Sequence, residues 1–350
     1  MNISVPVFAR LALVAGTLAG LSQASQALPT YAVRVVTDEG GVQSSTALNT
    51  RGTVAINTGS DGGSYSCSKT ACTPIPSLPN DLQLPFAYPR DIDDRGYVVG
   101  VSYTGSTSHA MLWDGQTVRD LGTFGEDDCG GCKSHSEASA INGNGVVVGY
   151  SDTANIDFQA FMWCDGTMTK LPTLGGTRSG ANGVNDAGDV VGFASLATGM
   201  NHAFLYRDGQ MRDLGVLRSG KFSTAFAVNN LGQVVGSSDT GQNKPSTVAF
   251  IYDQQGGMRE LPLLKGWRQM SASAINDAGW VVGTAVSSSG NLGFVFDGHG
   301  SFDLNLAMSE KDRKHWRIYH ANDINSKGQI LVEAQDKKKG DYRVLVLTPQ

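Results

Sequence analysis

VNNLGQVVG, at residues 228–236, shows the pattern that decides the fold: an aliphatic residue, Asn or Asp, two variable residues, Gly, one variable residue and an aliphatic run. The Asn or Asp side chain can cap a tight turn, and the Gly three residues later can adopt the left-handed conformation that closes it. The Val pair that follows favours a buried strand. Each copy of this pattern therefore predicts a β-hairpin.

The pattern occurs seven times along the chain. The copies are LNTRGTVAI (48–56), IDDRGYVVG (92–100), INGNGVVVG (141–149), VNDAGDVVG (184–192), VNNLGQVVG (228–236), INDAGWVVG (275–283) and INSKGQILV (324–332). Their first Asn or Asp recurs after 44, 49, 43, 44, 47 and 49 residues, which suits one four-stranded propeller blade per repeat. The predicted structural turn positions are Asn49, Gly52, Asp93, Gly96, Asn142, Gly145, Asn185, Gly188, Asn229, Gly232, Asn276, Gly279, Asn325 and Gly328.

A second apolar strand, ending in an Asp/Gly turn, follows most of these hairpins. Its clearest copies are HAMLWDG (109–115), QAFMWCDG (159–166), HAFLYRDG (202–209) and VAFIYDQQGG (248–257). The repeats place His109, Gln159, His202 and Val248 at one position. Because this position accepts Val, we interpret its histidines as structural, forming hydrogen bonds at a strand edge.

The two ends of the repeat array predict how a ring would close. The seventh repeat contributes three strands, the last at 342–347, and an extra strand at 31–36 precedes the first repeat. Pairing these two strands would complete a seventh blade and remove two exposed edges. The sequence therefore predicts an all-β, seven-bladed β-propeller over residues 28–350, as one domain, with the N-terminal strand completing the last blade. A short helix capped by Ser309 is expected over 309–315.

The first residues resemble a secretory signal. Arg10 precedes an apolar stretch at 11–21, and small residues end at Ala27, so residues 1–27 are predicted to be a signal peptide cleaved after Ala27. The apolar stretch is too short for a stable membrane anchor, which takes about 20 residues. We expect a secreted or periplasmic protein with no membrane span.

Charge and motifs narrow the function classes. The net charge is −5, and a nucleic-acid binder would show a basic face, so no nucleic-acid partner is expected. The basic run 337–339 is interpreted as a solvated hairpin tip. The sequence contains no GxSxG, HExxH or P-loop motif, and we assign no catalytic residue and no cofactor.

The five cysteines form two close pairs and one single residue. Cys67 and Cys72 are predicted to form a disulfide across a hairpin. Cys129 and Cys132 are also assigned a disulfide, which an oxidising compartment favours, although a redox pair or a metal site with His135 stays open. Cys164 follows a strand and is predicted to be a free, exposed thiol.

The repeat resembles the HAF extracellular repeat family, on the His-Ala-Phe at 202–204 with its variants, the Asn/Gly hairpin, the VVG strand and the Asp-Leu-Gly segment. The C-terminal unit also matches the family's ending, with DLN (303–305), Trp316, AxDIN (321–325) and LxLTP (345–349). The resemblance implies a secreted, propeller-like bacterial protein and no particular activity. The first repeat departs from it, carrying SYSCSKTACTPI (64–75) instead of a HAF segment.

Two functions fit these observations. The first is a recognition or scaffold module that binds an extracellular protein or glycan through its loops. The second is a hydrolase or lyase acting on polysaccharide with a site at the central channel, which would need paired acids there. The irregular segments expected to form a binding face are 57–90, 126–137, 237–247, 284–292 and 305–318. The sequence leaves the ligand and the oligomeric state open.

Overall fold

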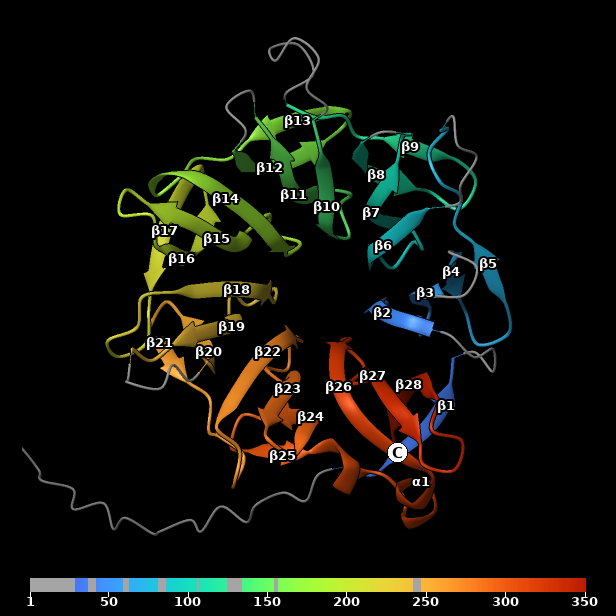
Figure 1. Ribbon diagram of the computed structural model, residues 1–350. Helices are drawn as coiled ribbons and strands as arrows, with labels where there is room; N and C mark the ends of the chain where they lie inside the picture. Colours follow the sequence, from blue (N-terminus) through green and yellow to red (C-terminus); the bar gives the residue numbers. More distant parts are fainter. Residues whose placement is uncertain are drawn as a thin grey trace, which may run out of the picture.

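The computed structural model describes residues 29–36, 42–58, 63–80, 86–105, 107–124, 134–153, 157–241 and 247–350. Its described residues form seven four-stranded antiparallel sheets arranged as a ring around a central channel (Figure 1). The predicted all-β, seven-bladed β-propeller is therefore confirmed. The predicted signal peptide and the pair Cys129 and Cys132 lie outside the described residues.

Each blade runs outwards from its first strand, which lines the channel. Blade 1 consists of β2 (Val42–Leu48), β3 (Val54–Thr58), β4 (Ser64–Cys67) and β5 (Cys72–Pro74). Blade 2 consists of β6 (Ala87–Ile92), β7 (Val98–Tyr103), β8 (Ser108–Trp113) and β9 (Val118–Asp120). Blade 3 consists of β10 (Ser136–Ile141), β11 (Val147–Asp152), β12 (Phe158–Cys164) and β13 (Thr167–Lys170).

The remaining blades repeat this order. Blade 4 consists of β14 (Gly175–Val184), β15 (Val190–Leu196), β16 (Asn201–Arg207) and β17 (Gln210–Gly215). Blade 5 consists of β18 (Ser223–Val228), β19 (Val234–Asp239), β20 (Thr247–Asp253) and β21 (Gly257–Glu260). Blade 6 consists of β22 (Gln269–Ile275), β23 (Val281–Ser287), β24 (Gly290–Phe296) and β25 (Ser301–Asp303). Blade 7 consists of β26 (Trp316–Ile324), β27 (Ile330–Asp336), β28 (Tyr342–Pro349) and β1 (Tyr31–Val35).

The ring closes through blade 7, as the sequence predicts. Strand β1 pairs antiparallel with β28, with Val33 opposite Leu347, and the backbone N–H of Gln350 donates to the carbonyl of Thr30 at 2.9 Å. The N-terminal strand is thus the outermost strand of the last blade (Figure 1). A short 3-10 turn, η1 (Leu304–Ala307), and the predicted helix α1 (Glu310–His315), capped by Ser309, connect blades 6 and 7.

The hydrophobic cores lie between neighbouring blades, and the Val-Val-Gly motif supplies both sides of them. Val98 packs in a cluster shared with blade 1, whereas Val99 packs in one shared with blade 3, because successive strand residues face opposite ways. A Cβ on Gly149 would lie 1.9 Å from the carbonyl oxygen of Glu137, so the β-bulge in β10 requires glycine at this position. The Phe of the HAF segment, as in Phe204, is fully buried.

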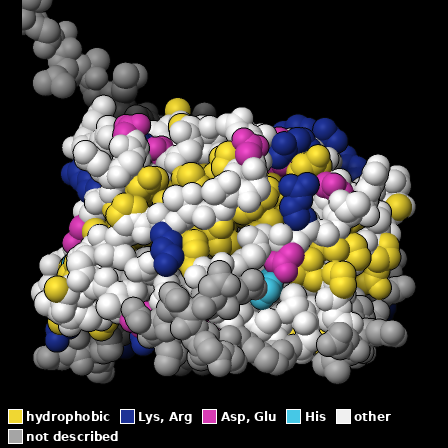
Figure 2. Space-filling view, turned by 90° about the horizontal axis from the view of Figure 1, so that it is seen from above, with side chains coloured by type: hydrophobic (Ala, Val, Ile, Leu, Met, Phe, Trp, Pro, Cys, Tyr) yellow, Lys and Arg dark blue, Asp and Glu magenta, His cyan; other side chains and the backbone are white. Residues whose placement is uncertain are grey.

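The outer rim presents both hydrophobic and charged side chains. On the side that Figure 2 shows, hydrophobic side chains form patches along the rim, with Lys, Arg, Asp and Glu side chains around and between them. In blade 1 the predicted disulfide joins Cys67 to Cys72, which are directly opposite each other on β4 and β5. In blade 2 the equivalent positions are Trp113 and Val118, so the disulfide replaces a hydrophobic cross-strand pair.

Ring closure can be tested at Tyr31, whose side chain is 1% exposed and packs against Met308 and the rest of the blade 7 core. The Tyr31→Ala variant should lose about 3 kcal/mol or more of unfolding free energy in urea denaturation, because it leaves a cavity in this core. Within the described residues the Tyr31 hydroxyl has no hydrogen-bond partner, so Tyr31→Phe should unfold within about 0.5 kcal/mol of the parent, or later. Equal losses in both variants would contradict this assignment.

Candidate functional site

The two faces of the ring differ in their connections. In each blade the connection between the first and second strands lies at one end of the ring, here named the turn face, as does the connection between the third and fourth strands in blades 1 to 6. The connection between the second and third strands and the connection to the next blade lie at the opposite end, the loop face. The described parts of the predicted segments 126–137, 237–247, 284–292 and 305–318 lie at loop-face connections and include the strand ends beside them, and 284–292 consists mostly of residues of β23 and β24. Segment 57–90 is less irregular than expected, since it contains β4 and β5 and their turn.

On the turn face, the repeated asparagines form a belt of hydrogen bonds around the channel. Within its own turn, the Oδ1 of Asn276 accepts the backbone N–H groups of Ala278 and Trp280 at 3.1 and 3.0 Å. Its Nδ2 donates to the carbonyl of Asn325, the equivalent residue of the next blade, at 3.2 Å. One buried amide side chain therefore caps its own turn and joins two blades.

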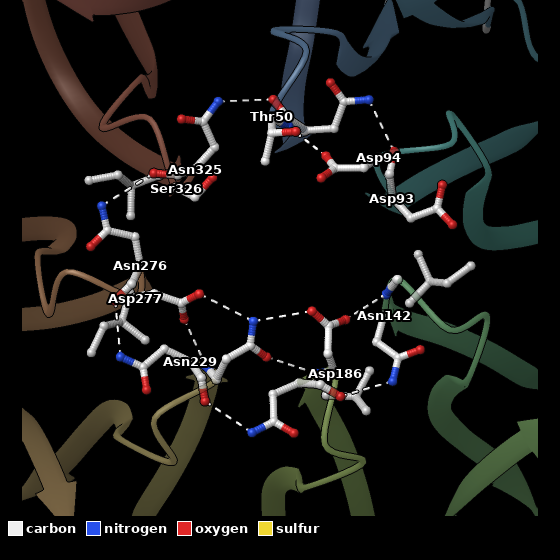
Figure 3. Close-up of a pocket in the computed structure, with 18 of the residues that line it drawn as sticks. Thr50, Asp93, Asp94, Asn142, Asp186, Asn229, Asn276, Asp277, Asn325 and Ser326 are labelled. Carbon is white, nitrogen blue, oxygen red and sulfur yellow. Dashed lines mark hydrogen bonds between the residues drawn. The ribbon is translucent and has the colours of Figure 1, made fainter.

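The same donation recurs between most blades (Figure 3). The Nδ2 donors and carbonyl acceptors are Asn49 to Asp93, Asn142 to Asn185, Asn185 to Asn229, Asn229 to Asn276, Asn276 to Asn325 and Asn325 to Asn49. The seventh position holds Asp93, which has no amide to donate to Asn142. Its carboxylate accepts the turn N–H groups and binds Arg95, so the belt is interrupted between blades 2 and 3.

A second row of polar contacts lies beside this belt. The residue after each first turn position is Thr50, Asp94, Gly143, Asp186, Asn230, Asp277 or Ser326. The N–H of Asn230 donates to Asp277 at 2.8 Å, and the N–H of Asp186 donates to Asn230 at 2.9 Å. With an aliphatic wall that includes Val228 and Ile275, these residues line a cavity of about 250 Å³. Its carboxylates are engaged with neighbouring turns.

Deeper in the channel, two aspartates brace adjacent blades. The Oδ2 of Asp91 accepts the N–H of Ile141 at 2.9 Å, from blade 2 to blade 3. The Oδ2 of Asp323 accepts the N–H of Leu48 at 2.7 Å, from blade 7 to blade 1. Both aspartates line a cavity of about 190 Å³ that Arg90 also lines.

The channel environment changes how these two acids titrate. Burial raises the pKa of Asp91 to about 7, the hydrogen bond from Ile141 opposes this, and the charge of Asp323 adds to it. Burial raises the pKa of Asp323 to about 6, against the hydrogen bonds from Leu48 and Ile324. The two groups are thus partly protonated near neutral pH. Since each carboxylate accepts a backbone N–H of the next blade, their geometry is that of inter-blade braces.

Sequence reasoning missed these aspartates, although a signal was present. Both lie two residues before the first turn position, where the other repeats carry Ala47, Ala140, Gly183, Ala227 and Ala274. An acid at a repeat position that otherwise carries Ala or Gly indicates a blade that forms an additional hydrogen bond to its neighbour.

The histidines of the HAF segment form hydrogen bonds with aspartates of the outermost strand. His109 Nδ1 lies 2.8 Å from Asp120, and His202 Nδ1 lies 2.9 Å from Asp213, which supports their structural interpretation. Burial would raise the pKa of Asp120, but the hydrogen bonds from His109 and from the N–H of Gly122 bring it below its ordinary value.

In two blades the Asp-Leu-Gly motif forms the same local hydrogen bond, from the glycine N–H to the aspartate. Asp120 and Asp213 each accept the N–H two residues on, from Gly122 and Gly215, at 2.8 and 2.7 Å. Blades 3 and 5 carry proline at that place, Pro172 and Pro262, which has no N–H to donate. These two blades accordingly have Lys170 and Glu260 in place of the aspartate.

The other predicted site residues are separate from the channel. Cys164 is exposed and forms no disulfide with any described residue; burial and the charge of Asp165 raise the pKa of its thiol. The Nδ1 of His135 lies 3.0 Å from the hydroxyl of Ser108. The described residues contain no group of three His, Cys, Asp or Glu side chains that could hold a metal ion, and Cys129 and Cys132 fall outside them.

The belt can be tested by changing one amide donor. The Asn276→Asp variant keeps the acceptor that caps the turn but cannot donate to Asn325, so it should lose about 1–3 kcal/mol of unfolding free energy at pH 7. Ser326→Asp adds the same charge at the exposed neighbouring turn and serves as the control, with an expected change within about 0.5 kcal/mol. Equal urea midpoints for Asn276→Asp and the parent would refute the belt's energetic role.

The raised pKa of Asp91 predicts a pH-dependent stability. An aspartate whose folded pKa lies above its unfolded value of about 4 binds its proton more tightly when folded. The tighter proton binding stabilises the folded state fully below about pH 4, and this stabilisation is lost as the pH rises to about 7, the pKa of Asp91 in the folded state. Because the side chain is only half-buried, we expect a loss of about 1–3 kcal/mol. Asp91→Asn should flatten this part of the profile in urea titrations at several pH values, and an unchanged slope would count against it.

Comparisons with known proteins identify the fold and no family. No family model matches the sequence, and no curated protein matches it. Among solved structures, it is similar to an acylaminoacyl peptidase from Pyrococcus horikoshii (TM-score 0.51, 10% identity, 85% of this chain and 50% of that one). It is also similar to TolB from Acinetobacter baumannii (TM-score 0.44, 11% identity, 92% and 63%) and to YCF48 bound to D1 peptide (0.47, 12%, 94% and 100%). The chain thus spans only part of the first two structures.

Proposed function

We propose that this chain is an exported recognition or scaffold protein of the HAF-repeat kind that binds its partner through the loop face. The observation that carries this proposal is the distribution of exposed hydrophobic side chains. Among the large hydrophobic side chains that are exposed in the described residues, Tyr103, Phe222, Leu263, Val286, Leu306 and Tyr342 lie on the loop face, whereas only Leu231 lies on the turn face. Exposed apolar groups gathered on one face are typical of an interaction surface.

Aromatic side chains near the loop-face end of the strands support this assignment. The ring of Tyr103, which is 44% exposed, lies 5.9 Å from Phe86 and 6.3 Å from Tyr88. Such a cluster offers a rigid, partly polar surface for stacking against a protein or a sugar ring. Trp316, in contrast, is 8% exposed and packs inside the ring, so it is not available to a partner.

The channel gives less support to a polysaccharide hydrolase or lyase. Such an enzyme needs two carboxyl groups free to act on one substrate bond. Asp186 and Asp277 at the turn face hold neighbouring turns together, and Asp91 and Asp323 hold adjacent blades. Each of these four acids thus already accepts a hydrogen bond from a neighbouring blade.

Export is supported by one observation beyond the predicted signal. The disulfide between Cys67 and Cys72 suits an oxidising compartment. No helix among the described residues is long and apolar enough to cross a membrane. We therefore assign the protein to the secreted or periplasmic space.

The proposal is tested by displaying residues 28–350 to an array of cell-wall glycans and a library of immobilised peptides. We expect at least one reproducible partner, whose binding weakens tenfold or more in Tyr103→Ser/Phe222→Ser. Leu231→Ser, which removes the exposed hydrophobic side chain of the turn face, should bind within twofold of the parent. Binding that depends on Leu231 alone, an empty array, or release of reducing ends from an arrayed polysaccharide would overturn the proposal.

A further inference from the structure

Blade 7 carries a basic patch that the overall charge of the chain conceals. The exposed cationic side chains are Lys311, Arg313, Lys314, Arg317, Lys337, Lys338 and Lys339. Residues 309–343 contain nine Lys and Arg against six Asp and Glu, a net charge of +3, although the whole chain has −5. The sequence suggested only a solvated hairpin tip at 337–339, because the helical residues that join it are distant in the chain.

The patch is formed by contacts between helix α1 and the loop-face turn at 337–340. The backbone N–H of Lys337 donates to the carbonyl of His315 at 2.8 Å, and the Lys337 ammonium donates to the carbonyl of Arg313. Asp336 lies 3.3 Å from His315 and accepts the N–H groups of Lys338 and Lys339. These bonds hold the turn against the helix, which lies beside β26 in Figure 1, and so bring the two groups of cations close together.

Most acids of this region are buried or already have a partner. Asp336 is 3% exposed, Asp312 accepts the hydroxyl of Ser309 at 2.6 Å, and Asp323 lies in the channel wall. Glu310 and Asp341 are the exposed acids; Glu310 binds Lys314 at 2.7 Å and Asp341 binds Arg343 at 3.2 Å. Among the described residues, Lys311, Lys337 and Lys338 are exposed and form no ion pair with a carboxylate.

An aromatic platform adjoins the cations. Tyr342 is 56% exposed, and its ring lies 5.8 Å from that of Tyr319. The guanidinium of Arg317 lies over the Tyr319 ring, 4.7 Å from its centroid, and the Tyr319 hydroxyl donates a hydrogen bond to Gln335. An exposed tyrosine held by its neighbours beside several cations suits a ligand that has both a flat apolar face and regularly spaced anionic groups.

We propose that this patch binds an anionic polysaccharide, whose sugar ring stacks on Tyr342 while its carboxylate, sulfate or phosphate groups contact the lysines. This inference rests on the proposed function, since the patch belongs to the loop face. A polysaccharide strand can follow one blade, whereas a duplex nucleic acid or a flat anionic membrane would also face the remaining, net negative, part of the ring.

The test uses residues 28–350 with four probes: alginate, heparin, neutral dextran and a 20-base-pair DNA duplex. The parent should bind alginate or heparin more tightly than DNA and should not bind dextran. Its affinity for alginate or heparin should be at least fivefold weaker in 300 mM NaCl than in 50 mM NaCl. Lys311→Glu/Lys338→Glu/Lys339→Glu should weaken this binding tenfold or more. Lys69→Glu/Lys221→Glu/Lys265→Glu, which changes the net charge equally at exposed lysines of other blades, should bind within threefold of the parent. Tyr342→Ser should weaken polysaccharide binding at least threefold.

Several outcomes would overturn the inference: no binding of either acidic polysaccharide, equal losses in the two triple variants, no effect of Tyr342→Ser, or tighter binding of DNA. The Tyr103→Ser/Phe222→Ser variant separates this inference from the proposed function, because it leaves the blade 7 patch unchanged. Suppose that this variant no longer binds the partner found on the array, and that the parent binds neither alginate nor heparin. The proposed function would then stand, and only the polysaccharide inference would be rejected.

Discussion

The buried asparagine amide is the interaction on which this ring depends. A propeller must keep seven separately folded sheets in register, and strand pairing acts only inside each sheet. Here one side chain in most repeats accepts backbone N–H groups of its own turn and donates one bond to the next blade, as at Asn276. The amide can do this because its acceptor oxygen and its donor nitrogen are separate atoms that point in different directions. Asp93 keeps the first role and loses the second.

The interfaces without a complete belt have other connections. Between blades 2 and 3, Asp91 reaches Ile141, and Arg90 forms an ion pair with Glu137 at 2.7 Å. Between blades 7 and 1 the belt bond from Asn325 to Asn49 is present, and Asp323 adds a second contact there. The repeat thus varies where an interface requires it, and the buried acids follow from that requirement.

The fold could be predicted because its determinants are local. The turn asparagines, their glycines and the Val pairs specify hairpins, their spacing specifies blades, and the extra strand at 31–36 specifies closure. The Cys67–Cys72 pair followed from its place on a hairpin. The channel braces and the basic patch could not be predicted in the same way. Asp323 and Leu48 are 275 residues apart, and Lys337 meets Arg313 only after blade 7 is formed.

The antiparallel pairing of β1 with β28 has a mechanical consequence. Tyr31 lies opposite Pro349, so the two ends of the ring leave the sheet at the same corner. A force that pulls these ends apart loads one hydrogen bond at a time, from that corner inwards, instead of loading the whole strand in shear. The closure that stabilises the ring against thermal opening is therefore its weakest element under tension. Tethers attached at both ends would therefore transmit little force before β1 separates from β28.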